Sequence, residues 1–213
     1  EPGVYEEERV RVDDGQRVSI WRCDRESESN KKEMQRVEWR SRDDYTLGAQ
    51  GSAAAVSVNG VHMFAVESDG YGNVFGCVAT GGGATLSLEG CDLTCEGDAD
   101  VAQFAENGTT GVMFGCCIHD GNECGVIISA EAVLRGNRIH DGKGVGVVIA
   151  AEASATLENN NIHSNTVFGV FVNGEGSEAV LRGNRIRDGK MIGVVIANKA
   201  SATLENNTTI DND

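Results

Sequence analysis

Residues 132–143 read Ala-Val-Leu-Arg-Gly-Asn-Arg-Ile-His-Asp-Gly-Lys, and residues 179–190 read Ala-Val-Leu-Arg-Gly-Asn-Arg-Ile-Arg-Asp-Gly-Lys. A second phrase, Ala-Ser-Ala-Thr-Leu-Glu-Asn-Asn, follows each copy, at residues 153–160 and 200–207. All four phrases share a leucine, which recurs at steps of 23, 24 and 23 residues: Leu134, Leu157, Leu181 and Leu204. A repeat of this period indicates that one small structural unit is stacked several times.

Each repeat consists of short runs in which apolar residues alternate with polar ones, separated by Gly, Asn or Asp. Alternation with a period of two is strand geometry, whereas helical repeats need a sustained period of 3.6, which is absent. Gly and Asn supply the positive φ angles that tight corners require. The pattern predicts an all-β solenoid, a parallel β-helix with coils of about 21–27 residues stacked ~4.8 Å apart.

The same frame extends upstream of the exact repeat, with less regular steps of 27, 25 and 21 residues. It passes through Met113 and Leu88 to Val61, and places Phe64 and Val66 in the later positions of that earliest coil. We therefore predict a single β-helix domain over residues 1–213, in which residues 61–213 form the regular coils.

Residues 1–60 are predicted to form N-terminal coils of the same domain. Residues 24–36 are rich in charge and have no apolar face, so we expect an exposed charged loop there. Residues 96–107 are polar and acidic, and we expect them to form a protruding loop between coils.

Stacking converts equivalent positions into columns of neighbouring side chains. Three residues after the leucine, the predicted column is Phe64, Cys91, Cys116, Asn137, Asn160, Asn184 and Asn207. Stacked Asn side chains can hydrogen-bond along the column, so we interpret Asn137, Asn160, Asn184 and Asn207 as a structural ladder. One residue after the leucine, charges alternate in sign, which favours register-fixing ion pairs: Arg135, Glu158, Arg182 and Glu205.

The net charge is -15 and the calculated pI is about 4.6. Such a surface repels nucleic acid and anionic lipid, so neither is expected as a partner. No apolar run is long enough to predict a membrane-spanning helix. The acidic balance also disfavours a polyanionic ligand unless Ca²⁺ mediates the contact.

The chain has seven cysteines, an odd number, and five of them lie between residues 91 and 124. Cys91 and Cys116 occupy equivalent positions on neighbouring coils, so a disulfide between them is one alternative. We favour the other, in which free thiols pack as small apolar side chains. Free thiols are typical of reducing compartments, which favours a cytoplasmic or nuclear location, with secretion as the alternative.

The opening motif Pro2-Gly3-x-Tyr5-x-Glu7, followed by two short strands, resembles the first coil of pectate-lyase-like right-handed β-helix proteins. The later motifs Leu-x-x-Asn-x-Ile and Gly-Val-x-Ile resemble the repeat of carbohydrate-binding and sugar-hydrolase (CASH) domains. The nearest resemblance is to the β-helix domains of F-box proteins. It covers nearly the whole chain and implies a right-handed β-helix that binds a protein substrate.

The best candidate site is the corner six and seven residues after each leucine-type position. Position six reads His119, His140, His163 and Arg187, and position seven reads Asp120, Asp141, Ser164 and Asp188. Stacked histidines flanked by carboxylates suit general acid–base chemistry or transition-metal binding. The candidate catalytic residues are therefore His119, Asp120, His140, Asp141, His163 and Asp188.

The alternative is a repeated turn, in which Asp caps backbone N–H groups and Gly follows. Arg187 replaces His and Ser164 replaces Asp in the repeat, as a turn allows, so we favour the turn and assign no metal site. His62 lies outside this column and is expected to be a surface or packing residue.

The enzymes that this fold resembles carry further signatures, and we find none of them here. We therefore favour a non-enzymatic scaffold or protein-interaction module without a cofactor. The alternative is a carbohydrate-active protein, namely a lyase, hydrolase, epimerase or sugar-binding domain, and only there are Ca²⁺ and a polysaccharide expected. The sequence stops partway through a coil, so we expect further chain, a protein partner or end-to-end self-association at that end.

Overall fold

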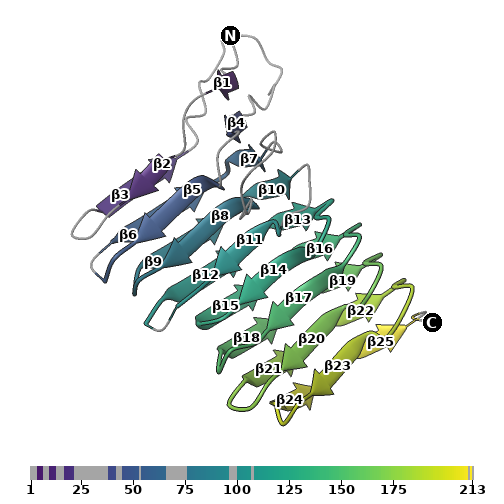
Figure 1. Ribbon diagram of the computed structural model, residues 1–213. Coiled ribbons are helices and arrows are strands. Elements are labelled where there is room, and N and C mark those ends of the chain that lie inside the picture. The colour runs from purple at the N-terminus through teal and green to yellow at the C-terminus, as the bar shows by residue number, and fades with distance from the viewer. Residues whose placement is uncertain are drawn as a thin grey trace.

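The computed structural model (Figure 1) describes residues 4–6, 10–12, 17–21, 38–41, 45–52, 54–65, 76–95, 100–106, 108–210 and 212. The predicted charged loop at residues 24–36 lies outside these residues, as do residues 96–99 and 107 of the predicted acidic loop. Every described element is a β-strand, and the strands are arranged in three sheets.

Sheet A contains nine strands: β1 (Val4–Glu6), β4 (Glu38–Ser41), β7 (His62–Ala65), β10 (Asp92–Cys95), β13 (Cys117–His119), β16 (Arg138–His140), β19 (Asn161–His163), β22 (Arg185–Arg187) and β25 (Thr208–Ile210). Sheet B contains eight: β2 (Val10–Val12), β5 (Tyr45–Gln50), β8 (Gly76–Gly81), β11 (Ala102–Phe104), β14 (Cys124–Ile128), β17 (Val145–Ile149), β20 (Val170–Asn173) and β23 (Val194–Ala197). Sheet C also contains eight: β3 (Arg17–Trp21), β6 (Ala55–Asn59), β9 (Thr85–Glu89), β12 (Thr110–Phe114), β15 (Glu131–Arg135), β18 (Ser154–Glu158), β21 (Glu178–Arg182) and β24 (Ser201–Glu205).

The chain visits the three sheets in turn, so every third strand joins the same sheet (Figure 1). Strands of neighbouring coils pair in parallel, as in β15 with β18 and β18 with β21. This arrangement confirms the predicted all-β parallel solenoid. In the described part of the chain, no helix has the length and apolar character needed to cross a bilayer.

The core is built from columns of identical or similar side chains. Leu134, Leu157 and Leu181 stand directly above one another in sheet C, and each is fully buried. The second residue of each sheet A strand from β7 to β22 forms another inward column: Met63, Leu93, Ile118, Ile139, Ile162 and Ile186. The repeated leucine and isoleucine of the sequence are therefore the two sides of one continuous core.

A glycine lies at or just before the start of each later sheet B strand for a steric reason. A Cβ atom on Gly146 would lie 2.6 Å from the carbonyl oxygen of Gly169, and one on Gly169 would lie 2.6 Å from that of Gly193. The coils approach each other so closely at this corner that only a hydrogen fits. The Gly-apolar-apolar motif of the sequence is thus a packing requirement of the corner.

The upstream register predicted from the sequence is wrong by three residues. Leu88 pairs with Val58, so Val61 instead lies level with Cys91 and belongs to the asparagine column. Phe64 pairs with Thr94 on the outer face of sheet A. Apolar residues alternate with polar ones on both sides of the Gly60 corner, so the sequence supports two registers. The correct register is hard to recognise because the step from Val58 to Leu88 is longer than the later steps.

The predicted acidic loop at residues 96–107 also needs correction, because it contains strand β11. Ala102 and Phe104 are buried in the core and Gln103 points outward between them. With only two core positions, this strand is too short to stand out among its acidic neighbours.

The asparagine column forms a hydrogen-bonded ladder along the solenoid. The Asn160 side chain accepts from the backbone N–H of Asn137 through Oδ1 (2.9 Å) and donates through Nδ2 to the Leu134 carbonyl (2.9 Å). Asn184 makes the same pair of bonds to Asn160 and Leu157. Each asparagine therefore satisfies two backbone groups of the coil before its own, at a corner that is otherwise cut off from water.

Cys91 and Cys116 continue this ladder with sulfur in place of the amide. The Cys116 thiol donates to the Leu88 carbonyl (3.5 Å) and the Cys91 thiol to the Val58 carbonyl (3.6 Å), as Asn137 does to Met113. The five cysteines whose side chains are described are free thiols. The neighbouring Cys91 thiol, together with burial, raises the pKa of the Cys116 thiol, which keeps it a hydrogen-bond donor.

Candidate functional site

Three histidines stack on the outer face of sheet A, at the ends of β13, β16 and β19. The ring centroids of His119 and His140 lie 5.4 Å apart with an angle of 16° between the rings, and those of His140 and His163 lie 4.9 Å apart at 5°. The rings are in register because the three strands pair residue for residue. The structure thus brings the predicted histidines into one continuous strip.

One nitrogen of each ring contacts the residue that comes next in the chain. Nδ1 lies 2.6 Å from a carboxylate oxygen in the pairs His119–Asp120 and His140–Asp141, and Nδ1 of His163 lies 3.1 Å from the Ser164 hydroxyl. Asp120, Asp141 and Ser164 have φ angles between 56° and 59°, the left-handed conformation of a tight corner. The side chain that partners each ring is therefore also the residue that turns the chain.

The other nitrogen of each ring reaches back to the preceding coil. Nε2 of His119 lies 2.9 Å from Asp92 Oδ1, and Nε2 of His140 lies 3.4 Å from the Cys117 sulfur. Nε2 of His163 accepts a hydrogen bond from Arg138 Nε at 3.1 Å. The partner changes along the strip from an anion to a thiol to a cation, so the three rings are electrostatically different.

The pKa values of His119 and His163 depend on burial as well as on the neighbouring charges. The hydrogen bond with Asp92 raises the pKa of His119, Asp120 adds to the rise, and burial opposes it. Burial lowers the pKa of His163, and the positive charges of His140 and Arg187 lower it further. The hydrogen bond with His140 lowers the pKa of Asp141. His119 therefore favours the charged form, and His163 favours the neutral form.

Asp188 occupies the next corner along, where it pairs with Arg187. The ring column ends here, because Arg187 takes the position that a fourth histidine would occupy. The strip of stacked imidazole rings is therefore confined to the three coils that carry histidine.

Sequence reasoning missed three neighbours of the strip: His62, Asp92 and Cys117. They form a column parallel to the histidines, at the first residue of β7, β10 and β13. Nε2 of His62, which is buried, lies 3.9 Å from Asp92 Oδ2. The signal was available for Asp92 and Cys117, because their coils were in the correct register and residues two apart on a strand share a face. Only His62 required the corrected upstream register.

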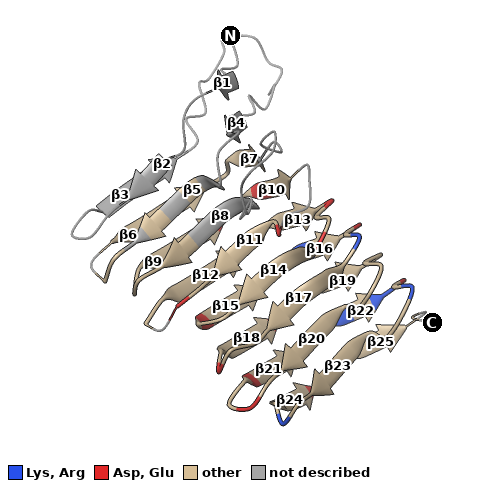
Figure 2. Ribbon diagram, in the orientation of Figure 1, with Lys and Arg blue, Asp and Glu red and all other residues tan. Residues whose placement is uncertain are grey.

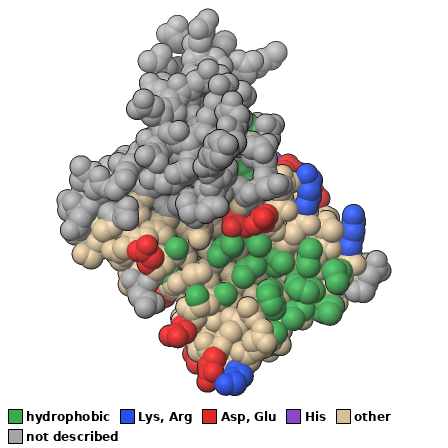
Figure 3. All heavy atoms as spheres, viewed as in Figure 1, with side chains coloured by type: hydrophobic (Ala, Val, Ile, Leu, Met, Phe, Trp, Pro, Cys, Tyr) green, Lys and Arg blue, Asp and Glu red, His purple; other side chains and the backbone are tan. Residues whose placement is uncertain are grey.

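A different surface covers the outer face of sheet B, and we call it the apolar strip. Its first row is Ile127, Val148, Phe171 and Val195, which pair along β14, β17, β20 and β23. A second row lies three residues earlier on each coil: Val145, Phe168 and Ile192. All are partly exposed, Ile192 the most at 52%, and Figure 3 shows hydrophobic side chains gathered over this face toward the C-terminal end of the stack.

The edge of the apolar strip beside sheet C is acidic. Glu106, Glu152 and Glu175 are exposed at the corners that come after β11, β17 and β20. Acidic residues mark the corners between sheets B and C in Figure 2, with Lys199 paired to Glu175 at the last one. The surface is therefore apolar in the middle and negatively charged along one side.

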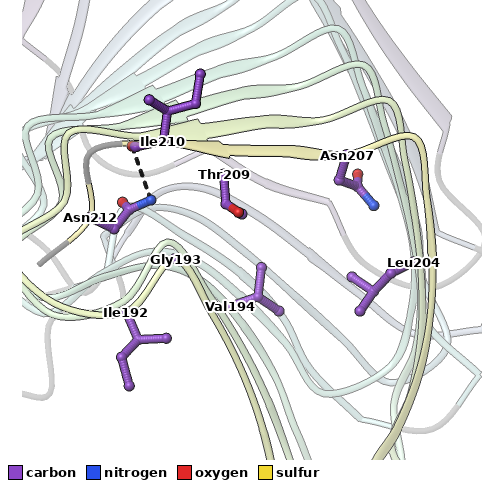
Figure 4. Close-up of a pocket in the computed structure, with 8 residues that line it drawn as sticks. All are labelled: Ile192, Gly193, Val194, Leu204, Asn207, Thr209, Ile210 and Asn212. Atoms are coloured by element: carbon purple, nitrogen blue, oxygen red, sulfur yellow. Dashed lines mark hydrogen bonds between the residues drawn. The ribbon is translucent and has the colours of Figure 1, made fainter.

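The last described coil exposes core-type side chains. Leu204 is 51% exposed, whereas Leu181 one coil earlier is fully buried. Leu204, Val194 and Thr209 face a shallow pocket between the last three strands (Figure 4). Asn212 lies at one side of this pocket, where its Nδ2 donates to the Ile210 carbonyl at 3.1 Å.

A comparison with curated proteins gave no match. A family model, described as right handed beta helix region, matches residues 49–177 and 98–213, which together cover most of the chain. This match agrees with the three parallel sheets and with the single core that runs from Leu47 to Ala202. The chain therefore belongs to the right-handed β-helix family.

Proposed function

We propose that this β-helix is a non-enzymatic protein-interaction module that binds a folded partner through the apolar strip of sheet B. The observation that carries the proposal is the contrast between this face and the rest of the molecule. Two rows of Val, Ile and Phe side chains lie outside the core on a chain whose net charge is -15. Contiguous exposed apolar patches of this kind mark interaction sites on soluble proteins.

The strip fits a protein better than a glycan. Branched aliphatic side chains make up most of it, and its two aromatic rings, Phe168 and Phe171, are tilted at 54° to each other. Sugar rings stack on flat aromatic platforms, whereas a protein surface packs well against uneven aliphatic side chains. The acidic edge formed by Glu106, Glu152 and Glu175 favours a partner that frames its apolar patch with Lys or Arg.

Two further observations support this proposal. The motifs of the chain resemble the substrate-recognition β-helix domains of F-box proteins, and the free thiols fit a cytoplasmic or nuclear protein. The face is also rigid, because β14, β17 and β20 are held on both sides by parallel pairing within one solenoid. Rigid scaffolds lose little conformational entropy on binding.

The test compares partner capture by the wild type, Phe171→Asp and Thr156→Asp, each used as bait in extracts of the source cells. Thr156 is the matched control, because it is a partly exposed central strand residue on the outer face of sheet C. We expect a partner that binds the wild type and the Thr156 variant and is lost from the Phe171 variant. The purified partner should then protect sheet B from hydrogen exchange.

Three outcomes contradict the proposal. A partner that binds all three proteins equally does not use the apolar strip, and protection confined to sheet A or C places the interface elsewhere. Concentration-dependent dimerisation that Phe171→Asp abolishes would make a second copy of the chain the occupant. Light scattering of the purified protein measures this last case directly.

A carbohydrate-active protein is the second candidate, because His119–Asp120 and His140–Asp141 are hydrogen-bonded pairs of the kind used in acid–base catalysis. A panel of pectin, polygalacturonate, alginate and neutral glycans, with and without Ca²⁺, tests it. Turnover that disappears in a folded His140→Gln variant would establish this function in place of the first. Absence of turnover is the result we expect.

A further inference from the structure

We infer that Asp92, Cys117 and His119 form a binding site for a zinc-type divalent metal ion on the outer face of sheet A. One ligand atom from each of the three side chains lies within 4.8 Å of the other two. Within the described part of the chain, no other set of three potential ligands comes this close together. This site is separate from the apolar strip and does not depend on the proposed function.

The donor set matches the chemistry of zinc. Thiolate sulfur, imidazole nitrogen and carboxylate oxygen are its usual protein ligands, and in a tetrahedral site such atoms lie roughly 3.3–3.6 Å apart. Nε2 of His119 and Oδ1 of Asp92 are 2.9 Å apart, so they need to separate by only a few tenths of an ångström. The mixed set excludes Mg²⁺ and Ca²⁺, which prefer oxygen ligands alone.

The second nitrogen of His119 is already held as a metal-bound histidine requires. Nδ1 lies 2.6 Å from Asp120 Oδ2, which fixes the ring and leaves Nε2 directed toward Asp92. A carboxylate on the far nitrogen is the usual support of a zinc-binding histidine, because it sets the tautomer and strengthens the ligand. Asp120 is therefore inferred to be a positioning residue of the site.

The site is rigid and open to solvent. Asp92 stands on β10, and Cys117 and His119 share β13, the next strand of sheet A, where Asp92 pairs with Cys117. The side chains of His119 and Asp92 are 22% and 32% exposed, so an ion can reach them without unfolding the coil. A bound ion would link two neighbouring coils, with its fourth position available to water or a nearby side chain.

Titration with Co²⁺ under reducing conditions tests the inference, because a cobalt–thiolate bond gives a charge-transfer band in the near ultraviolet. We expect one Co²⁺ per chain, with tetrahedral visible bands, displaced by Zn²⁺. Cys117→Ser should remove the charge-transfer band, and Asp92→Asn and His119→Gln should weaken binding at least about ten-fold. Asp120→Asn should weaken it about 10–100-fold, the usual effect of losing a carboxylate behind a ligand.

Two matched controls separate this site from adventitious binding. Cys124→Ser removes another partly exposed thiol, and His163→Gln removes the last ring of the stack; neither should change the spectrum or the affinity. Circular dichroism checks the fold of each variant. If Cys117→Ser does not fold, the Co²⁺ affinity of Asp92→Asn provides the test instead. A wild type without the band at millimolar Co²⁺, or a band that survives in folded Cys117→Ser, would overturn the inference.

Discussion

At the scale of single residues, His119 and His163 are chemically identical side chains whose pKa values are shifted in opposite directions. His119 lies between two carboxylates, Asp92 and Asp120, which raise its pKa, whereas burial is the main cause of the lowered pKa of His163 and nearby positive groups add to it. The same residue type in the same column therefore responds to a different environment on each coil. The sequence motif shows the histidines, but the tuning depends on residues more than twenty positions away.

This difference predicts two opposite pH dependences of stability. Because the folded state raises the pKa of His119, its contribution to stability is complete below the unfolded pKa of about 6.5 and is lost as pH rises through the folded value. Because the folded state lowers the pKa of His163, stability is lost as pH falls from about 6.5 through its folded value.

Thermal unfolding of His119→Gln and His163→Gln across pH 5–9 measures both effects. The deficit of His119→Gln relative to the wild type should be greatest at the acid end and shrink as pH rises. His163→Gln should lose less stability on acidification than the wild type does. Parallel curves for all three proteins would show that the partners do not set the ring pKa values.

At the scale of strands and corners, close approach between coils determines which residues fit. Gly169 begins the sheet B part of its coil, and a Cβ there would lie 2.4 Å from Cγ2 of Ile186 and 2.6 Å from the Gly193 carbonyl oxygen. Neither neighbour can move freely, since Ile186 is fully buried and the carbonyl belongs to the backbone of the next coil.

We therefore expect Gly169→Ala to lower the free energy of unfolding by about 1–3 kcal/mol, the usual cost of overpacking a well-filled site. Ser154→Ala, on the exposed side of β18, should change it by less than about 0.5 kcal/mol. Urea denaturation of the two variants beside the wild type gives both numbers. A Gly169 variant as stable as the Ser154 variant would show that the corner relaxes.

Most of the later strands could be predicted from the sequence, because Leu134 to Leu204 repeat in nearly constant steps and alternate with polar residues. The earlier coils were harder, since the turn before Leu88 is long and both Val58 and Val61 fit the leucine position. The candidate site followed the same division. The rings of His119, His140 and His163 were predicted together, but His62 belongs to a coil whose register local alternation does not determine, and Asp92 was missed although its own coil was in the correct register.

At the scale of the whole molecule, the cost of a core cavity depends on its position along the stack. Leu157 and Leu204 occupy the same column of sheet C, yet Leu157 is fully buried and Leu204 is half exposed. In a solenoid each coil contacts only its neighbours, so an end position loses about half of its packing.

Leu157→Ala should therefore cost about 2–5 kcal/mol of unfolding free energy, and Leu204→Ala less than about 1.5 kcal/mol. Chemical denaturation measures both costs. Because the two substitutions are identical and lie at equivalent strand positions, the difference in β-strand propensity between Leu and Ala is the same in both variants. Equal costs would mean that Leu204 is covered in solution, for example by a second copy of the chain. In that case the midpoint of the denaturation curve would depend on protein concentration.

The asparagine ladder gives the molecule a direction as well as a shape. Each Asn side chain bonds to backbone groups of the coil before its own, and this direction is the same at every step. Whole repeats cut at the same column are thus interchangeable modules, and adding or removing one leaves every other junction intact. Each coil adds ~4.8 Å to the length of the solenoid. Evolution or an engineer can therefore change that length one coil at a time.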